Sequence, residues 1–347
     1  MKRILIALLL LLVMPITVVS ANSYTAPEAP DSAIKYMPPE TSNFGEGIWY
    51  VLRNACSDLI PDMMDALRLC GSVIAVVLLI SMLSGTTGVS NHVINLVAVV
   101  AIATQLTTAS NTMIHLAAET INSLKEYGKL LLPTMAAALA AQGGITGSTA
   151  LYAATAVFSS VLTAVISNIL IPMIYVFICL SIANAALDEN LLTKLRDFIK
   201  WFTTWFLKVL LYVFTGYMTV TGVVTGSADA SVLKAAKLTI SGAVPVVGGI
   251  LSDTSEAILV SAGVMKNAAG VYGILAFIAI CLEPFLKIGV QYLLIKLIAA
   301  ISASFGSKKV VGLISDYSAA MGLALAMTGT VCLLLLISTV CFMKGAL

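Results

Sequence analysis

Glu283, Lys287 and Lys296 are the charged residues best placed for chemistry within an otherwise apolar part of the chain. Glu283 and Lys287 are four positions apart, so they can form an ion pair on one face of a helix. Pro284 follows Glu283 directly and indicates a helix boundary. Two interpretations stay open: a charged pathway through a membrane, or interfacial charges at a turn. Lys296 lies deeper in the apolar stretch, and we expect it to face the bundle interior or to extend its amine to the membrane surface.

The sequence contains no motif for catalysis, metal binding or nucleotide binding. There is no H-E-x-x-H, no G-x-S-x-G and no glycine-rich loop that ends in Gly-Lys-Ser or Gly-Lys-Thr. His92 and His115 are 23 residues apart, and we assign neither of them a partner at helical spacing. We interpret them as loop and helix-end residues, and we expect no enzyme activity, no metal and no cofactor.

Residues 241–253 form the most unusual segment, because they are uncharged before Asp253 yet contain residues that interrupt helices. Pro245 removes a backbone donor, and Gly248 and Gly249 permit sharp bends. Irregular backbone at membrane depth needs cover from protein or a water-filled cavity. A re-entrant hairpin that lines a pore and a kinked, closely packed helix pair are both open interpretations. The candidate pore or packing residues are Gly242, Pro245, Gly248, Gly249, Asp253, Glu283, Lys287 and Lys296.

The elements that hold these residues are predicted to lie in a membrane. Residues 130–187 carry no charge, and as one helix they would be about 87 Å long against a hydrocarbon core of about 30 Å. We therefore expect this run to fold back at least once. The chain is 59% hydrophobic and 10% charged, where soluble domains carry about 25% charged residues. The runs do not alternate strictly, which predicts helices and not an outer-membrane barrel.

The expected fold is an all-α, polytopic integral membrane protein with six to eight transmembrane helices, and a re-entrant segment is compatible with it. Residues 130–142 are too short to span, and we expect them at the interface or in a re-entrant turn. Separate spans or apolar blocks are predicted at residues 70–88, 93–116, 148–166, 168–187, 201–224, 238–253, 257–282, 288–305 and 318–342.

The N-terminal region predicts export. Lys2 and Arg3 precede a short apolar core, and small residues up to Ala21 fit a signal peptidase site. An uncleaved anchor is the alternative. The predicted domains are a signal peptide at 1–21, an extracytoplasmic tail with an amphipathic helix at 22–69, and a multi-span membrane domain at 70–347. The tail region 22–65 holds seven acidic and two basic residues, as translocated segments do.

The net charge, the cysteines and the small residues indicate which partners and which contacts within the chain we expect. The net charge of +2 is accounted for by Lys2 and Arg3, so we expect the lipid bilayer as a partner and no nucleic acid. Cys56 and Cys70 flank the first predicted span, and a disulfide between them is an open alternative. Closely spaced small residues such as Gly222 and Gly226 allow tight helix packing or a homo-oligomer.

At residues 241–253 the chain resembles the stage III sporulation protein AE family, and the likeness continues through residues 255–263 and 284–290. The resemblance implies a multi-pass protein of the mother-cell membrane around the forespore. It would be a subunit of the channel-like, secretion-like complex between the two cells, with other subunits of the stage III sporulation channel complex as partners. No catalytic residues carry over from the family.

A second hypothesis comes from a different class: an autonomous secondary transporter of a small solute. Such transporters often contain paired broken helices in corresponding halves. The glycines at 143–147 and 242–249 are the candidates for such a pair. Assembly with partners would favour the channel subunit, and saturable uptake by the protein alone would favour the transporter.

Overall fold

The computed structural model describes residues 27–38, 44–86, 91–141, 145–187, 192–220 and 268–345. These residues are helical or lie in short turns, and they contain no strand. The elements are α2 (Asp31–Ile34), α3 (Phe44–Thr86), α4 (Asn91–Ala141), α5 (Ile145–Val165), the π-turn η2 (Ile166–Leu170), α6 (Ile171–Ala186), α7 (Thr193–Val220), α10 (Ala268–Ser302) and α11 (Lys308–Gly345). The all-α prediction is therefore confirmed for the part of the chain described.

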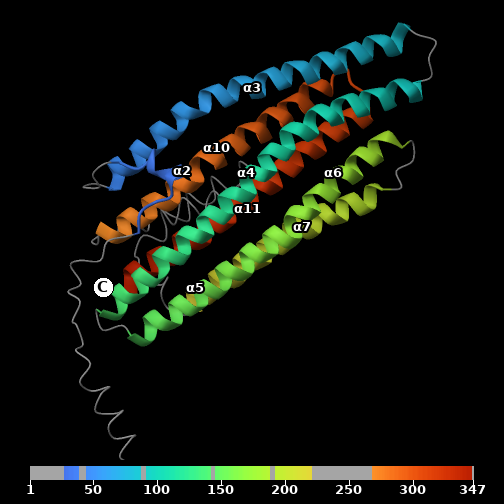
Figure 1. Ribbon diagram of the computed structural model, residues 1–347. Helices are drawn as coiled ribbons and strands as arrows, with labels where there is room; N and C mark the ends of the chain where they lie inside the picture. The colour runs from blue at the N-terminus through green and yellow to red at the C-terminus, as the bar shows by residue number, and fades with distance from the viewer. Residues whose placement is uncertain are drawn as a thin grey trace, which may run out of the picture.

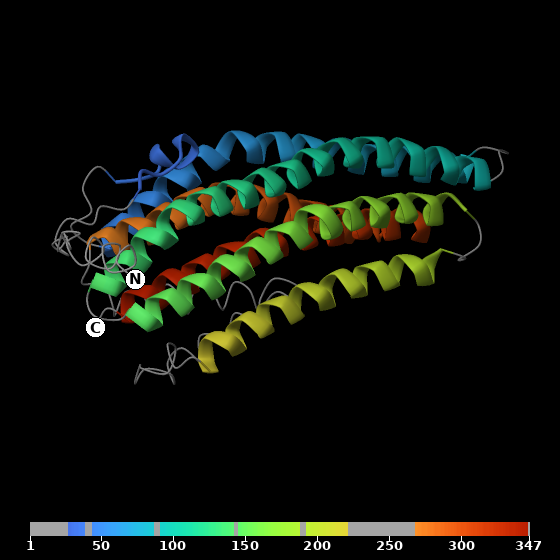
Figure 2. The same ribbon diagram turned by 60° about the horizontal axis from the view of Figure 1, so that its bottom comes forward.

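The long helices lie side by side in an elongated bundle (Figures 1 and 2). The end of α3, the start of α4, the end of α6 and the α10–α11 turn lie at one end of it, and α2, the end of α4 and the start of α5 lie at the other. Helix α11 occupies the centre, where it packs mainly against α10 and α4. Of its most apolar 18-residue window, 94% is buried within the protein, so these apolar side chains pack against other helices.

Six of the described helical stretches are long and apolar enough to cross a membrane: Phe44–Ser84, His92–Ala137, Tyr152–Ala186, Thr193–Tyr217, Gly270–Ser302 and Lys308–Phe342. The chain is thus a polytopic membrane protein, and six agrees with the lower limit of the predicted range. Most of these helices exceed the length that a bilayer requires. Helix α4, with 51 residues, is about 77 Å long, more than twice the thickness of a hydrocarbon core.

The predicted fold-back within residues 130–187 is confirmed, because α4 ends at Ala141 and α5 returns along it from Ile145. The prediction that residues 130–142 form a separate short element is wrong. Helix α4 continues through the charged positions Lys125, Glu126 and Lys129 and through Pro133 up to Ala141. The charges do not interrupt it, since they point outward or pair at helical spacing, as Lys129 and Glu126 do at 2.7 Å.

The predicted separation of spans 148–166 and 168–187 is also wrong. Helices α5 and α6 form one run, joined by the single π-turn Ile166–Leu170. Pro172 follows in the first turn of α6. A proline cannot donate the next helical hydrogen bond, and the wider π-turn accommodates this without ending the helix.

Glu283 and Pro284 do not mark a helix boundary as predicted. Pro284 lies inside α10, which runs from Ala268 to Ser302 and joins parts of two apolar blocks that were expected to be separate. Proline is tolerated within transmembrane helices because neighbouring groups can satisfy the freed backbone carbonyl.

The alternative of a Cys56–Cys70 disulfide is excluded by α3. Both thiols are free and belong to this one continuous helix. Fourteen residues of helix separate them by about 21 Å, whereas a disulfide requires Cα atoms within about 7 Å. The helix predicted within the tail 22–69 corresponds to the first part of α3, which continues directly into residues 70–86.

Candidate functional site

The described N-terminal segment, residues 27–38, is held against the bundle. Ala33 and Tyr36 are fully buried there. The Tyr127 hydroxyl of α4 donates to the Pro27 carbonyl at 3.3 Å, and the Ala29 amide donates to the Tyr272 hydroxyl of α10 at 3.4 Å. This segment is therefore fastened to two helices that are distant in sequence.

Beside this segment, Lys287 links α10 to α3. Its Nζ lies 2.8 Å from Glu283 Oε1 and 2.9 Å from Asp62 Oδ2. The predicted pairing of Glu283 with Lys287 at four-residue spacing is therefore present. The additional partner Asp62 comes from α3, and the sequence offers no direct signal for it, because more than 200 positions separate the two residues.

Lys35 extends the same group of charges from the N-terminal segment. Its Nζ lies 3.0 Å from Asp58 Oδ2 and 4.0 Å from Glu283 Oε1. The Tyr36 hydroxyl donates to Asp58 Oδ2 at 2.9 Å. Burial raises the pKa of Tyr36, with the hydrogen bond to Asp58 adding to the effect. The phenol therefore stays protonated and keeps its role as donor.

We call Lys35, Asp58, Asp62, Glu283 and Lys287 the ionic cluster. It contains three carboxylates and two amines, so its formal charge is −1. The inner pair is mostly buried, with 18% of the Glu283 side chain and 23% of the Lys287 side chain exposed. The outer pair of Lys35 and Asp58 is about half exposed, and such pairs contribute little to stability. The inner pair is costly to break, because removing one partner leaves a desolvated charge.

The ionic cluster is suited to holding elements together. Each amine is already engaged by at least one carboxylate. No group of three His, Cys, Asp or Glu residues that could hold a metal ion occurs in the described part of the chain. The chemistry of the cluster is therefore the attachment of α2 and its flanking residues to α3 and α10.

Lys296 lies apart from the ionic cluster, on the outside of α10. Its side chain is exposed. Its Nζ donates to the Tyr292 hydroxyl at 3.2 Å and lies 5.5 Å from the centroid of that ring. The structure thus favours the expectation that Lys296 extends along the surface over the expectation that it faces the interior. The remaining candidates, Gly242, Pro245, Gly248, Gly249 and Asp253, lie outside the described residues, and their role stays a prediction.

A second ion pair, at the opposite end of the bundle, was missed by the sequence reasoning. Arg196 of α7 places Nη1 2.9 Å from Asp316 Oδ2 of α11, and Asp316 is buried. Arg196 also binds its neighbour Asp197 at 2.8 Å. Near this pair, Lys309 donates to the carbonyl of Leu187. An aspartate inside a long apolar run was the available signal, because such a residue needs a partner.

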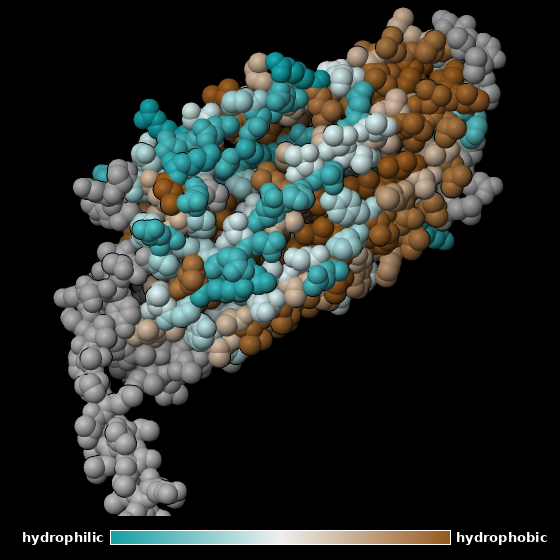
Figure 3. All heavy atoms as spheres, viewed as in Figure 1, coloured by the Kyte–Doolittle hydropathy of each residue, from teal (hydrophilic) through white to brown (hydrophobic). Residues whose placement is uncertain are grey.

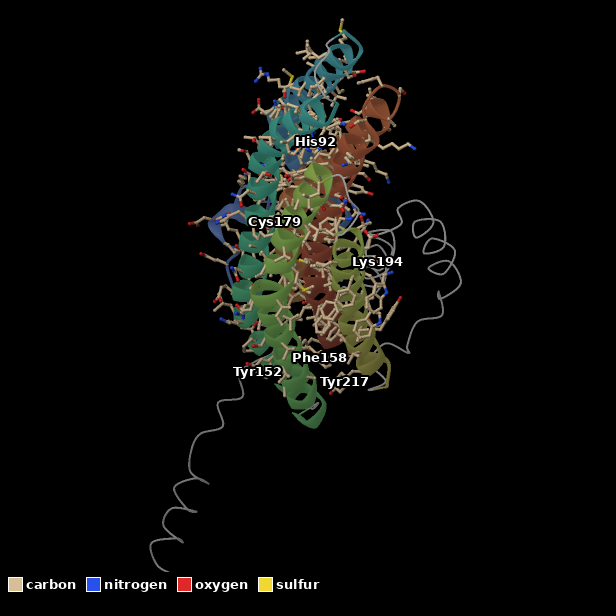
Figure 4. The ribbon with its side chains drawn as sticks, turned by 90° about the vertical axis from the view of Figure 1, so that its right-hand side faces the viewer. His92, Tyr152, Phe158, Cys179, Lys194 and Tyr217 are labelled. Carbon is tan, nitrogen blue, oxygen red and sulfur yellow. The ribbon has the colours of Figure 1, made fainter. Side chains whose placement is uncertain are left out.

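The two ends of α7 differ in character (Figure 4). Lys194 lies in its first turn, close to the α6–α7 connection, whereas Tyr217 lies near its other end and faces Phe158 of α5. The Phe158 ring centroid is 5.9 Å from that of Tyr217 and 5.5 Å from that of Phe214. Aromatic contacts therefore attach the apolar end of α7, and ionic contacts attach its charged end.

The assignment of no helical partner to the histidines is wrong for His115. Its Nδ1 lies 3.3 Å from Glu119 Oε1, one helical turn later on α4, and both side chains are exposed. His92 is the second residue of α4, where a helix-end residue was expected.

A cavity of about 360 Å³ lies between the end of α3, the start of α4 and the α10–α11 turn. Its wall combines apolar side chains with a few hydroxyl and amide groups and contains no ionisable side chain. The lining residues are Val77, Ile80, Ser81, Ser84, Ile94, Asn95, Ala98, Phe305, Gly306, Ser307 and Val310.

Comparisons with known proteins agree with the resemblance seen in the sequence. The sequence model of the family described as Stage III sporulation protein AE matches residues 40–345. The chain is similar to Stage III sporulation protein AE of Bacillus subtilis (strain 168), with 26% identity over 198 residues. This alignment covers 57% of the chain and 50% of that protein, so it spans about half the length of the relative. No solved structure matches the chain.

Proposed function

Because the chain belongs to the stage III sporulation protein AE family, we propose that it is a membrane-embedded subunit of the mother cell–forespore channel complex required for endospore development. The family match over residues 40–345 is the observation that carries this proposal. The six helices able to span a membrane fit a component of a membrane channel. The partners in this proposal are the other subunits of the complex, and the location is the mother-cell membrane around the forespore.

The distribution of charge supports one orientation in that membrane. Lys194, Arg196 and Lys200 at the start of α7 lie at the same end of the bundle as Lys308 and Lys309 at the start of α11. Positive charges near the ends of spans favour the cytoplasmic side. In our proposal this end faces the mother-cell cytoplasm, and the N-terminal segment 27–38 faces the space between the two membranes. A cleaved signal peptide at 1–21 would deliver the segment to that side.

In this proposal the ionic cluster has a structural role. It holds the N-terminal segment in one position relative to α3 and α10 on the intermembrane side, through Lys35, Asp62 and Lys287. A companion subunit on that side would then meet a fixed surface. The protein acts as a non-enzymatic part of the assembly, and the domain division into 1–21, 22–69 and 70–347 belongs to the same proposal.

Deletion of the gene in its own host tests the proposed function. We expect engulfment to finish and forespore development to stop afterwards, because a channel subunit is needed only once the forespore is enclosed. A wild-type copy should restore spores, and the solubilised, tagged protein should co-purify with other membrane proteins of the complex.

Normal numbers of heat-resistant spores from the deletion strain would contradict the proposal. The transporter hypothesis has no support from the family relationship. It would replace the channel subunit only if the purified protein alone catalysed saturable uptake into vesicles.

A further inference from the structure

The cavity of about 360 Å³ beside the α10–α11 turn, which we call the turn cavity, is separate from the ionic cluster. It lies among the end of α3, the start of α4 and residues 305–310. Its lining on α3 extends from Val77 to Ser84, a length of about 10 Å. Ligand pockets in proteins usually have volumes of about 300–1,000 Å³. The turn cavity can therefore hold a small molecule or a single hydrocarbon chain.

The turn that forms one wall of this cavity is packed closely against α3. A Cβ atom placed on Gly306 would lie 3.0 Å from Val77 Cγ1 and 2.8 Å from the Ser302 carbonyl oxygen. The Gly306 amide donates to the same carbonyl at 2.7 Å. The Ser307 hydroxyl oxygen accepts from the Val310 amide at 3.4 Å, and so it caps the start of α11. These contacts fix the wall, so the turn cavity is a feature of the folded bundle.

Two polar side chains that line the turn cavity have no hydrogen-bond partner within the described part of the chain. They are the Ser81 hydroxyl and the Asn95 amide, and both residues are partly buried. The Ser84 hydroxyl, in contrast, donates to the Ser81 carbonyl at 2.7 Å. An amide can donate two hydrogen bonds and accept others, and burying it without partners costs free energy. A bound molecule with hydroxyl or ester oxygens would satisfy both groups.

The lining favours an uncharged ligand with one polar and one apolar part. No ionisable side chain occurs among the described residues that line the turn cavity, so a charge inside it would lose water without gaining a counter-ion. Ser84 and Asn95 lie nearer to the ends of their helices than Val77 and Ala98, which are buried. The cavity thus offers hydrogen bonds toward the helix ends and apolar contacts further in.

The exterior beside the turn cavity is apolar. Leu79, Met82 and Val97 each neighbour a lining residue in the sequence, and they are 61%, 70% and 59% exposed. Figure 3 shows hydrophobic residues over the end of the bundle where α3 ends and α4 begins. Large apolar side chains that share an exposed surface need lipid or protein against them. In a membrane protein this surface gives access to molecules dissolved in the lipid.

We propose that the turn cavity binds an uncharged, single-chain amphiphile from the membrane, of the monoacylglycerol class. Asn95 and Ser81 hydrogen-bond its hydroxyl or ester oxygens, and Val77, Ala98 and Val310 contact its chain. A phospholipid fits less well, because its phosphate meets no cation among the lining residues and its two chains need more volume. The proposal does not depend on the channel function, since it uses only the lining and the exterior of this one chain.

Photo-crosslinking of the full-length protein in nanodiscs of neutral phospholipid tests the proposal. The probe is a monoacylglycerol that carries a diazirine in its chain. The comparison probe is a lysophosphatidylglycerol with the same diazirine chain, and unlabelled monoacylglycerol serves as the competitor. Mass spectrometry of proteolytic peptides locates and counts the adducts.

We expect saturable adducts of the monoacylglycerol probe on residues 77–84, 94–98 and 305–310, and we expect the competitor to remove them. Labelling of the exposed residues Val157 and Val161 on α5 measures general contact with lipid. Equal labelling of α5 and the turn cavity, without competition, would overturn the proposal. Equal labelling of the cavity by lysophosphatidylglycerol would also overturn it, because the site would not select an uncharged head. A cavity that takes up no probe holds water only, which is a third contrary result.

Two pairs of variants test the lining directly. Ala98→Phe fills the cavity from a buried position, and Val97→Phe adds the same bulk on the exposed side of α4. Asn95→Leu removes the amide from the cavity, and Asn122→Leu removes an exposed amide of the same helix. We expect Ala98→Phe and Asn95→Leu to lower saturable labelling by about fivefold or more, and their controls to stay near the wild type.

The unfolding midpoint of each variant separates loss of binding from loss of folding. Asn95→Leu is the decisive variant, because Ala98→Phe can also disturb the packing of α4. Wild-type labelling of Asn95→Leu would overturn the proposed hydrogen bonds. These measurements use the purified protein, so a failure of labelling leaves the sporulation phenotype intact. A strain that sporulates without the gene would contradict the channel function and leave the labelling result intact.

Discussion

Lys287 of α10 lies 2.9 Å from Asp62 of α3, and this one ion pair joins two helices that are more than 200 residues apart in the chain. The same amine pairs with Glu283 of its own helix at 2.8 Å. Lys287 therefore stands between two carboxylates, and Lys35 from the N-terminal segment lies 4.0 Å from one of them, Glu283. The tertiary arrangement turns a local helix pair into an attachment point for three segments.

Replacing Lys287 by alanine should lower the stability of the purified protein more than replacing Lys296. Lys287→Ala leaves Glu283 mostly buried without its closest cation, a loss on the order of 1–3 kcal/mol. Lys296→Ala removes an exposed amine that contacts only Tyr292 in the described structure and should have little effect. Thermal unfolding of both variants in the same detergent compares them directly. Equal midpoints would show that the ionic cluster does not stabilise the fold.

The Arg196–Asp316 pair should behave as a buried ion pair. Arg196→Met should destabilise α7 against α11, because it leaves the buried Asp316 without its cation. The double variant Arg196→Met/Asp316→Leu should recover most of the lost stability, since it removes both charges. The measurement is limited proteolysis at the α6–α7 connection together with the unfolding midpoint. A double variant that is less stable than Arg196→Met would contradict this account.

The mature protein should begin near Asn22. Lys2, Arg3, the short apolar core and the small residues up to Ala21 form a predicted signal peptide. N-terminal sequencing of the membrane-bound form checks this directly. Retention of Met1 would instead support the uncleaved anchor.

Gly248→Leu and Gly249→Leu should each impair sporulation more than Leu→Ala changes in neighbouring apolar runs. The expected reason is that a large side chain blocks the bend or the close backbone approach that glycine permits. Spore counts are compared at matched protein levels in the membrane. Wild-type counts for both glycine variants would remove the functional case for residues 241–253.

The number and length of the helices show where sequence reasoning succeeded and where it failed. The long uncharged runs predicted a helical membrane protein and a fold-back within residues 130–187, and both are correct. The individual boundaries were wrong at Pro284 and around Ile166–Leu170. Proline usually kinks or ends a helix in water, but a membrane bundle can satisfy the backbone around it and continue the helix.

The sequence by itself determined the class of the protein, because a chain that is 59% hydrophobic and 10% charged cannot form a water-soluble shell. It also determined the pairing of Glu283 with Lys287, since four-residue spacing places both on one helix face. Only the tertiary structure decided that Asp62 and Lys35 join this pair and that Arg196 meets Asp316. Contacts of this kind depend on which helix faces turn toward each other, and one chain's hydrophobic pattern does not specify the neighbours of a given face.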